Sequence, residues 1–346
     1  MAAMAIVTAA STAVHAQLSE GPLSPGTVVN DAVSGTSLWV TPGNAAISDN
    51  LYATTAPGGL PSQYLKATGF NFSIPPVAEI TGIEAVIERR SLGGTVFDAA
   101  VRIVKGGVVG STDRAAGGFW PMADATTTYG DDSDLWGETW TPADINAAGF
   151  GVAVSATDTF DTAGVDHITL TVYYTLCGEA PAAGCRTAGK STLSVTDKTP
   201  DTKDKLSWKW TKGESTATGE FADPVNTAVY SLCVYAGTTS ALIADALVPP
   251  HATKWEPIST KGFRYKDKIP TEDGIQKILV KASIDNKSKA TVKGKGTGLP
   301  DITPPLSLPV TVQLVNSDSG ICWESSYTSL HLKKNEIGKF KAKFAP

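Results

Sequence analysis

Long apolar runs, histidine and known catalytic motifs are scarce in this sequence of 346 residues. After Ala16, no segment approaches the roughly 18 consecutive apolar residues that a membrane-spanning helix needs, so the sequence predicts no transmembrane segment. The chain has 4 histidines and contains no GxSxG nucleophile elbow, HExxH zinc motif, P-loop or dinucleotide-binding fingerprint. Because no group of residues suited to acid–base or nucleophilic chemistry is evident, we expect the protein not to be an enzyme.

Cysteine is absent before position 177, and all 4 cysteines of the chain follow from there: Cys177, Cys185, Cys233 and Cys322. An even number confined to one half of the chain predicts disulfide bonds and an oxidising compartment. Three pairings are possible. We favour Cys177 with Cys185, which would close a small loop containing Gly and Pro, and Cys233 with Cys322, which would join two distant strands. A zinc site is the weaker explanation, because no CxxC spacing occurs.

The N-terminal segment has the character of an export signal. Met1 to Ala16 is apolar and rich in small residues, and Val14-His15-Ala16 before Gln17 fits the small-x-small pattern that signal peptidases cleave. No Lys or Arg precedes the apolar run, so an Ala-rich tail is the alternative interpretation. We expect a signal peptide over residues 1–16 and a secreted protein, extracellular or at the cell surface.

The balance of charge changes sign within the chain. Up to Leu176 there are 6 basic and 17 acidic residues, a net charge of −11, whereas from Cys177 onward there are 23 basic and 17 acidic residues, a net charge of +6. A chain of this length suggests two domains. We therefore predict an acidic domain over residues 17–176, a short disulfide-bridged hinge over 177–185, and a basic domain over 186–346.

Both domains show the alternation of antiparallel β-strands. The 33 glycines and 21 prolines predict many turns and short strands. In the segment Val165 to Thr175, apolar residues alternate with threonine and tyrosine, as a strand with one buried and one wet face requires. In the segment Val96 to Val104, the alternation predicts that Asp98 faces solvent. A single helical turn is expected from Thr141 to Ala148, because Thr141 precedes a proline and an acidic residue.

In the basic domain, lysine alternates with apolar residues. Leu206, Trp208 and Trp210 alternate with Lys205 and Lys209, and the pattern recurs near residues 264–266, 277–281 and 339–344. The fold class is therefore all-β, with two antiparallel β-sandwich domains of jelly-roll or Ig-like type, the second being a sandwich or a barrel.

Lysine on the outward face has three interpretations. It can block sheet-to-sheet aggregation, or it can form an electropositive surface for an anionic polysaccharide, lipopolysaccharide or nucleic acid. A third is that the basic domain meets the acidic domain of a neighbouring molecule in a head-to-tail assembly. Specific nucleic-acid recognition is not expected, because the basic domain has only two arginines, Arg186 and Arg264.

The segment Tyr129 to Asn146 combines acidic and aromatic residues. Asp131, Asp132 and Asp134 offer the oxygen ligands that calcium prefers, although their spacing is not that of an EF-hand. Two pairs of tryptophans, one in each domain, are candidates for stacking on a sugar: Trp136, Trp140, Trp208 and Trp210. The alternative is that the tryptophans belong to the cores and the aspartates form a solvated turn.

The first domain resembles, over nearly its whole length, a β-sandwich module of secreted and phage-structure-like proteins of environmental bacteria. The resemblance depends on short motifs spread over the domain: Trp39 to Ala45, Gly69 to Phe72, Ile80 to Ile83, Leu135 to Gly137, Phe150 to Val152 and Val172 to Tyr174. The second domain is similar to a cysteine-containing C-terminal module common in exported bacterial proteins, through Gly184 to Arg186, Leu206 to Trp210, Leu232 to Tyr235, Trp255, Lys293 to Gly296 and Cys322 to Glu324. The resemblances imply β modules of exported proteins and no reaction.

These observations favour a secreted or cell-surface structural or adhesive β protein, such as a subunit of an extracellular assembly. The alternative is a lectin-like carbohydrate-binding protein that uses exposed tryptophans and a loop calcium site. No other cofactor is expected, and the expected partners are a second copy of the chain or a surface polysaccharide.

Overall fold

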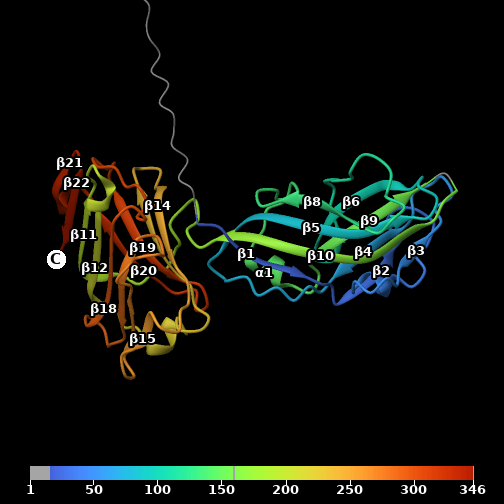
Figure 1. Ribbon diagram of the computed structural model, residues 1–346. Coiled ribbons are helices and arrows are strands. Elements are labelled where there is room, and N and C mark those ends of the chain that lie inside the picture. The colour runs from blue at the N-terminus through green and yellow to red at the C-terminus, as the bar shows by residue number, and fades with distance from the viewer. Residues whose placement is uncertain (1–15, 159, 346) are drawn as a thin grey trace, which may run out of the picture. The chain divides into compact units, whose positions relative to one another are not determined.

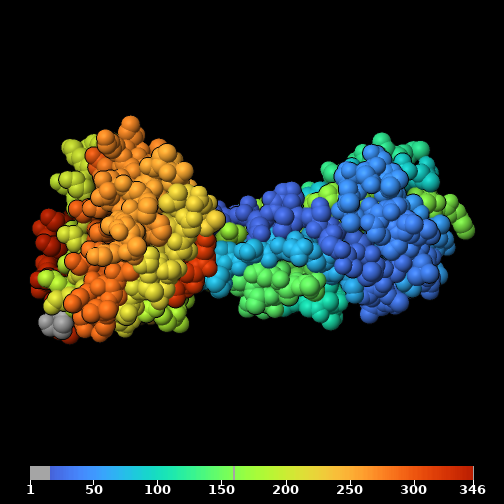
Figure 2. Space-filling view, turned by 90° about the horizontal axis from the view of Figure 1, so that it is seen from below, coloured from blue at the N-terminus to red at the C-terminus, as the bar shows by residue number. Residues whose placement is uncertain are grey.

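The computed structural model describes residues 16–158 and 160–345, which form antiparallel β-sheets with one short α-helix. The chain divides into two compact units, residues 17–175 and residues 176 onward. In the space-filling view each unit shows its own run of chain colours, blue to green for the first and yellow-green to red for the second (Figure 2). The predicted signal peptide lies, apart from Ala16, outside the described residues. Within them, no helix is long and apolar enough to cross a membrane.

The first unit is built from two five-stranded antiparallel sheets. One sheet has the order β1-β10-β5-β8, with β3 also paired to β10, and the other has the order β2-β4-β9-β6-β7. The strands of the first sheet are β1 (Leu18–Leu23), β3 (Ala53–Thr55), β5 (Glu79–Ser91), β8 (Ala125–Asp131) and β10 (Ala163–Thr175). Those of the second are β2 (Thr27–Asp31), β4 (Tyr64–Thr68), β6 (Phe97–Lys105), β7 (Val108–Val109) and β9 (Gly151–Thr157).

The two longest strands, β5 and β10, pair along their whole length, and burial alternates along most of β5. Ile83 faces Val172 and Ile87 faces Ile168 across the pair, and all four side chains are fully buried. Such cross-strand apolar pairs are the main source of stability in a sheet. Helix α1 (Pro142–Asn146) begins where the sequence predicts a helical turn, because Thr141 and Asp144 form a capping box.

The second unit contains a sheet of eight strands and a sheet of four. The eight-stranded sheet has the order β15-β16-β17-β18-β12-β11-β22-β21, and the four-stranded sheet has the order β14-β13-β19-β20. The strands of the larger sheet are β11 (Ala188–Thr196), β12 (Lys205–Gly213), β15 (Trp255–Pro257), β16 (Gly262–Lys266), β17 (Ile275–Lys281), β18 (Ser288–Lys295), β21 (Leu332–Glu336) and β22 (Lys339–Phe344). Those of the smaller sheet are β13 (Tyr230–Ala236), β14 (Ala241–Val248), β19 (Val310–Asn316) and β20 (Cys322–Tyr327).

One hydrophobic cluster holds the second unit together, and both of its sheets contribute to it. The larger sheet supplies inward rows such as Val292, Trp208 and Leu193, which face one another across neighbouring strands. The smaller sheet supplies residues such as Leu232 and Leu314. Figure 1 shows β11, β12 and β18 in one layer and β14, β19 and β20 in another. The outward face of the larger sheet is therefore the face that carries its polar residues.

The disulfide bonds differ from the predicted pairing. Cys177 pairs with Cys233, and Cys185 pairs with Cys322. Backbone hydrogen bonds place Cys185 beside Cys322, because Arg186 N donates to the carbonyl of Cys322 over 2.8 Å. All four cysteines thus belong to the second unit. The predicted Cys177–Cys185 clasp and the bridged hinge over 177–185 are wrong: this segment is fastened to the second unit at both ends.

Asp98 is a second departure from the sequence pattern. It was expected to face solvent, but it is 7% exposed and pairs with Arg89, which is 4% exposed. Trp120 Nε1 and Tyr129 OH donate to its two carboxylate oxygens over 2.8 and 2.9 Å. The side chain is buried because partners from other elements satisfy its charge and its lone pairs.

Candidate functional site

Three of the four candidate sugar-stacking tryptophans belong to the cores. Trp136, Trp208 and Trp210 are each 0% exposed. Trp136 Nε1 donates to the carbonyl of Ile83, and Trp210 Nε1 donates to the carbonyl of Glu324. A ring without exposed surface cannot stack on a sugar, so the expected role of these three residues is corrected to core packing.

Trp140 is half-buried, and its surroundings leave little of the ring free. Its Nε1 donates to the carbonyl of Leu135 over 3.0 Å, and its ring meets Phe150 edge-on with centroids 5.3 Å apart. Lys105 Nζ lies 5.0 Å from the ring centroid, within the range of a cation–π contact. A sugar would have to displace the lysine to reach that face. The structure therefore gives the lectin-like interpretation no exposed aromatic platform at the predicted residues.

The three aspartates of the expected calcium loop have separate contacts. Arg114 donates to both carboxylate oxygens of Asp134 over 2.5 and 2.7 Å, and this hydrogen bonding lowers the pKa of Asp134. Asp131 accepts from the backbone and the hydroxyl of Ser133, which lowers its pKa. Asp132 is exposed. The calcium loop stays a prediction, and these contacts do not support it.

Another acidic group was not predicted as a metal site. Among the described residues, ligand oxygens of Glu88, Asp124 and Asp166 lie within 4.8 Å of one another. They come from β5, the segment before β8, and β10. Asp166 accepts from the backbone amides of Asp49 and Asn50 over 3.4 and 3.2 Å. Acidic side chains often gather without an ion, so this group alone does not define a metal site.

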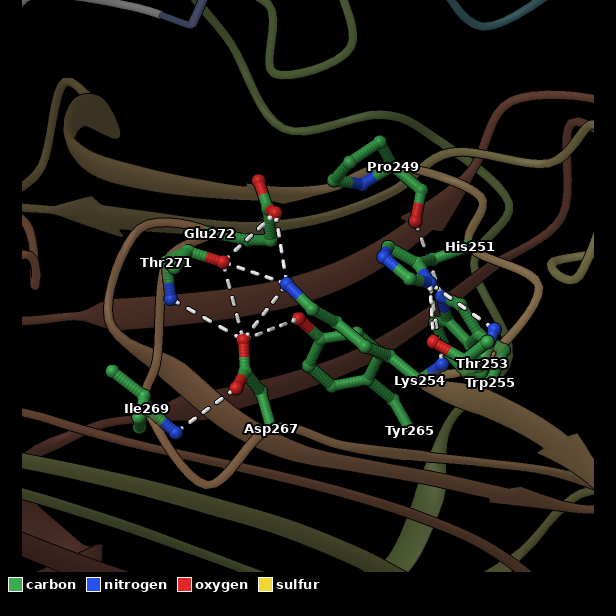
Figure 3. Close-up of polar contacts among 10 residues, drawn as sticks. All are labelled: Pro249, His251, Thr253, Lys254, Trp255, Tyr265, Asp267, Ile269, Thr271 and Glu272. Carbon is green, nitrogen blue, oxygen red and sulfur yellow. Dashed lines mark hydrogen bonds and ion pairs between the residues drawn. The ribbon is translucent and has the colours of Figure 1, made fainter.

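The three described histidines each take part in local hydrogen bonds. His251 Nδ1 accepts from the backbone amides of Thr253 and Lys254 over 3.1 and 3.3 Å, as Figure 3 shows. His331 Nδ1 accepts from the backbone of Thr328 in the same way, and His167 Nε2 lies 2.9 Å from Ser24 Oγ. These contacts shape turns and join loops to strands.

The main electrostatic feature of the described residues is the outward face of the eight-stranded sheet. Successive side chains of a strand point to opposite faces, and Leu206, Trp208 and Trp210 of β12 point into the core. The alternate residues of β12 therefore point outward, including Lys205 and Lys209, which are both exposed. The same alternation in the neighbouring strands defines what we name the basic sheet face: Lys190, Lys205, Lys209, Lys277, Lys281, Lys289, Lys293, Lys295, Lys339, Lys341 and Lys343.

Strand register places many of these lysines directly opposite one another. Lys277 pairs with Lys293, Lys281 with Lys289, and Lys205 with Lys295. Opposed residues have Cβ atoms about 5 Å apart, and like charges in such positions are destabilising. Across the next two strands the rows continue with serine and threonine and end at the lysines of β22. The face is thus a regular array of positive charges and hydroxyl groups.

No lysine of the basic sheet face forms an ion pair among the described residues, although strand register places Glu336 of β21 opposite Lys339 at one end of the face. The ion pairs of the second unit involve other cations, such as Arg186 with Glu220 and Arg264 with Glu256. Charges on the face are therefore balanced by solvent ions or by a partner.

Lys254 differs from the lysines of the basic sheet face, because two carboxylates neutralise its charge (Figure 3). Its Nζ lies 2.9 Å from Asp267 Oδ2 and 3.1 Å from Glu272 Oε1, and it donates to Thr271 Oγ1 over 2.6 Å. Burial opposes the charge of Lys254, but the hydrogen bonds to the two carboxylates outweigh it and raise the pKa to about 12. Burial also raises the pKa of Tyr265, which donates to Asp267, to about 12. This group fastens the loop after β16 and leaves no charge for a ligand.

No protein-family model matches the chain, and a comparison with curated proteins finds no match.

Proposed function

We propose that this protein is an extracellular adhesive protein that binds an anionic polysaccharide through the basic sheet face of its second unit. The observation that supports the proposal is the array of opposed, uncompensated lysines on the outer side of β17, β18, β12, β11 and β22. Neighbouring strands lie about 4.8 Å apart, and outward residues repeat about every 6.8 Å along a strand. An extended polyanion would meet several of these charges at once.

The physical reason is the repulsion between the lysines. Each opposed pair costs stability when it is alone, and the repulsion falls when a polyanion lies over the face. Binding also releases counterions from the polymer, as it does when lysines neutralise nucleic-acid phosphates. Blocking of aggregation by lysine remains an alternative explanation, but it needs charges at sheet edges and not in the middle strands, where Lys209 and Lys293 lie.

A polysaccharide suits the face better than a nucleic acid does. Proteins that bind single strands use aromatic rings to stack bases, whereas the uncharged residues opposite Lys209 and Lys293 are serine and threonine: Ser207, Thr192 and Thr291. Lysine also lacks the fork with which arginine reads base edges. The two disulfide bonds are consistent with an oxidising compartment.

The architecture fits such a role. We propose that each unit is an antiparallel β-sandwich of jelly-roll or Ig-like type, supported by the two sheets found in each. In secreted proteins, folds of this kind present one broad sheet face to solvent.

Binding of dextran sulfate tests the proposal, with neutral dextran and duplex DNA as comparison ligands. The face triple variant carries Lys277→Gln, Lys293→Gln and Lys341→Gln. It should bind dextran sulfate at least about tenfold more weakly near 0.1 M salt, because each lysine that is lost releases up to about one counterion fewer from the polymer. The matched control carries three substitutions at exposed lysines outside the basic sheet face and outside the hollows at its ends: Lys261→Gln, Lys268→Gln and Lys333→Gln.

The control variant should stay within about threefold of the wild type, since its net charge changes equally and only the location differs. Equal weakening in both variants would mean that net charge, not the face, binds the polymer. Tighter binding of duplex DNA would favour a nucleic-acid partner. Absence of dextran sulfate binding by the wild type at low salt would overturn the proposal.

The opposite net charges of the two halves, −11 and +6, favour self-assembly as a second candidate function. Basic and acidic units of neighbouring molecules would then attract one another head to tail. Sedimentation velocity at about 20 mM and about 300 mM salt tests this, because screening shortens the range of surface charges. A monomer at both salt concentrations would exclude assembly of this kind.

A further inference from the structure

A hollow of about 520 Å³ lies at one end of the basic sheet face. Strands β11, β12, β17 and β18 and the β17–β18 loop contribute to it. Its eight lining residues are five lysines and three uncharged polar residues: Lys190, Lys212, Lys281, Lys287 and Lys289, with Thr211, Ser283 and Asn286. A hollow of this size has room for one or two sugar residues, as small-molecule sites of several hundred Å³ do.

A β-bulge in β12 builds one wall of the hollow. Trp210 faces Ala290 and Gly213 faces Ser288, so the two residues Thr211 and Lys212 lie opposite the single residue Lys289. An extra residue in one strand re-aims its side chains and bends the strand. In a regular strand only every second residue would face the hollow. Because of the bulge, the neighbouring residues Thr211 and Lys212 both line it.

The buried ring of Trp210 holds this bulge in place. A Cβ on Gly213 would lie 1.8 Å from Cη2 and Cζ3 of the Trp210 ring, so only glycine fits beneath it. Lys212, the residue before that glycine, has a φ of 52°, a left-handed conformation that a lysine rarely adopts. Backbone strain at a non-glycine residue is common at functional sites. The geometry thus places a strained cationic residue at the edge of the hollow.

The charges of the hollow are uncompensated. None of its five lysines forms an ion pair within the described part of the chain. Asp285 is nearby and accepts from Asn286 Nδ2, but it does not line the hollow. A larger hollow at the other end of the face differs, because Asp197 and Glu336 contribute to its lining. The lining residues therefore carry a net charge of +5 at the bulge and +3 at the other end.

We infer that this hollow is a binding subsite for a tetrahedral oxyanion, the sulfate or phosphate ester of a polysaccharide. The inference rests on the proposed function and names the chemical group that the face would select. Several lysines act as point charges from different directions and Ser283 adds a hydroxyl group, which suits a compact anion with three free oxygens; the hydroxyl of Thr211 donates to the carbonyl of Lys190 over 3.0 Å. A planar carboxylate would be better recognised by the fork of an arginine, and no arginine lines the hollow.

The test compares a sulfated polymer, dextran sulfate, with a carboxylated one, polygalacturonate, on the full chain. The hollow triple variant carries Lys212→Gln, Lys281→Gln and Lys289→Gln, and the face triple variant defined above serves as its matched control. The hollow triple should lose at least about tenfold in affinity for dextran sulfate and less than about threefold for polygalacturonate. The face triple should weaken both polymers by a similar factor.

Amide and lysine chemical shifts, followed by NMR during titration with inorganic sulfate and inorganic phosphate, locate the anion and distinguish the two esters. Saturable shifts at Lys212 and Lys289, absent in the hollow triple, are expected. Equal loss for both polymers in the hollow triple, without saturable shifts, would overturn the subsite and leave the adhesive function standing. Saturable shifts in a wild type that binds neither polymer would keep the subsite and reject the adhesive function.

Discussion

Replacing Asp98 by asparagine tests the buried network of the first unit. Asp98 forms an ion pair with Arg89 and accepts hydrogen bonds from Trp120 and Tyr129. The backbone amide of Ala116 also donates to it over 2.8 Å. Burial raises the pKa of Tyr129 above its ordinary value, and the neighbouring carboxylate of Asp98 raises it further, so this phenol stays a donor. The variant keeps the size of the side chain but removes its charge.

The expected cost follows from the guanidinium that the substitution leaves behind. The side chain of Arg89 is 5% exposed, so water cannot replace the lost carboxylate. Removing one partner of a buried ion pair lowers the free energy of unfolding by about 3–5 kcal/mol. Because asparagine can still accept from Trp120, we expect about 3 kcal/mol, a large share of the roughly 5–15 kcal/mol by which domains are stable. The melting temperature of the first unit should fall by roughly 6–12 °C.

Urea denaturation followed by tryptophan fluorescence and far-UV circular dichroism measures this loss. The matched control is Asp113→Asn, because the Arg102–Asp113 pair is 3.6 Å long and both side chains are about one third exposed, at 32% and 34%. That variant should cost less than about 1 kcal/mol. Adding Arg89→Met to Asp98→Asn should recover part of the loss. If Asp98→Asn costs no more than Asp113→Asn, the reasoning is refuted.

Two further predictions concern the disulfide bonds and pH. Non-reducing peptide mapping should join Cys185 to Cys322 and Cys177 to Cys233, and a Cys177–Cys185 peptide would contradict the structure. Replacing both cysteines of the Cys185–Cys322 bond by serine should destabilise the second unit by up to about 5 kcal/mol, because the bond closes a loop of 137 residues. The same change at Cys177–Cys233, which closes a loop of 56 residues, should cost up to about 4 kcal/mol. Burial alone would raise the pKa of Asp161, but hydrogen bonds from a serine hydroxyl and three backbone amides outweigh it and lower the pKa to about 2. A carboxylate whose pKa is lowered by folding stabilises the folded state at pH values above its unfolded pKa, near 3.9, and this contribution is lost as the pH falls toward 2. Asp161→Asn should therefore lower the free energy of unfolding, measured by urea denaturation, by about 1–2 kcal/mol at pH 6 and by almost nothing at pH 2. A cost independent of pH would contradict this.

The strand pattern of the sequence predicts much of the fold. The segments predicted at Val96 to Val104 and Val165 to Thr175 correspond closely to β6 and β10, because their alternation in sequence spans many residues. The segment before residue 35 shows little periodicity, yet it contains β1 and β2. These strands are short and polar, and they form by pairing with strands more than thirty residues away in sequence. β1 pairs with β10, and β2 pairs with β4.

Burial of single polar or aromatic residues depends on such distant partners and was predicted less well. Asp98 has the alternation of an outward residue, but Arg89 and Trp120 make its burial possible. The tryptophans of β12 were candidates for ligand stacking because tryptophan occurs both in cores and on binding surfaces. Their position beneath the smaller sheet decides between the two, and that position follows from how the sheets pack.

The basic sheet face shows where prediction from sequence stops and where structure adds chemistry. The alternation of lysine with apolar residues predicts that Lys209 and Lys341 point outward, and the structure agrees. It does not predict that Lys281 lies opposite Lys289, nor that the bulge at Lys212 joins them, because register depends on pairing between strands distant in sequence. A periodic pattern thus identifies a charged face, whereas cross-strand register decides whether its charges are spread evenly or concentrated. In this sheet, register and the bulge bring five lysines around one hollow whose lining has no acidic residue, which is the reason to expect selectivity for one kind of anion in addition to general attraction to polyanions.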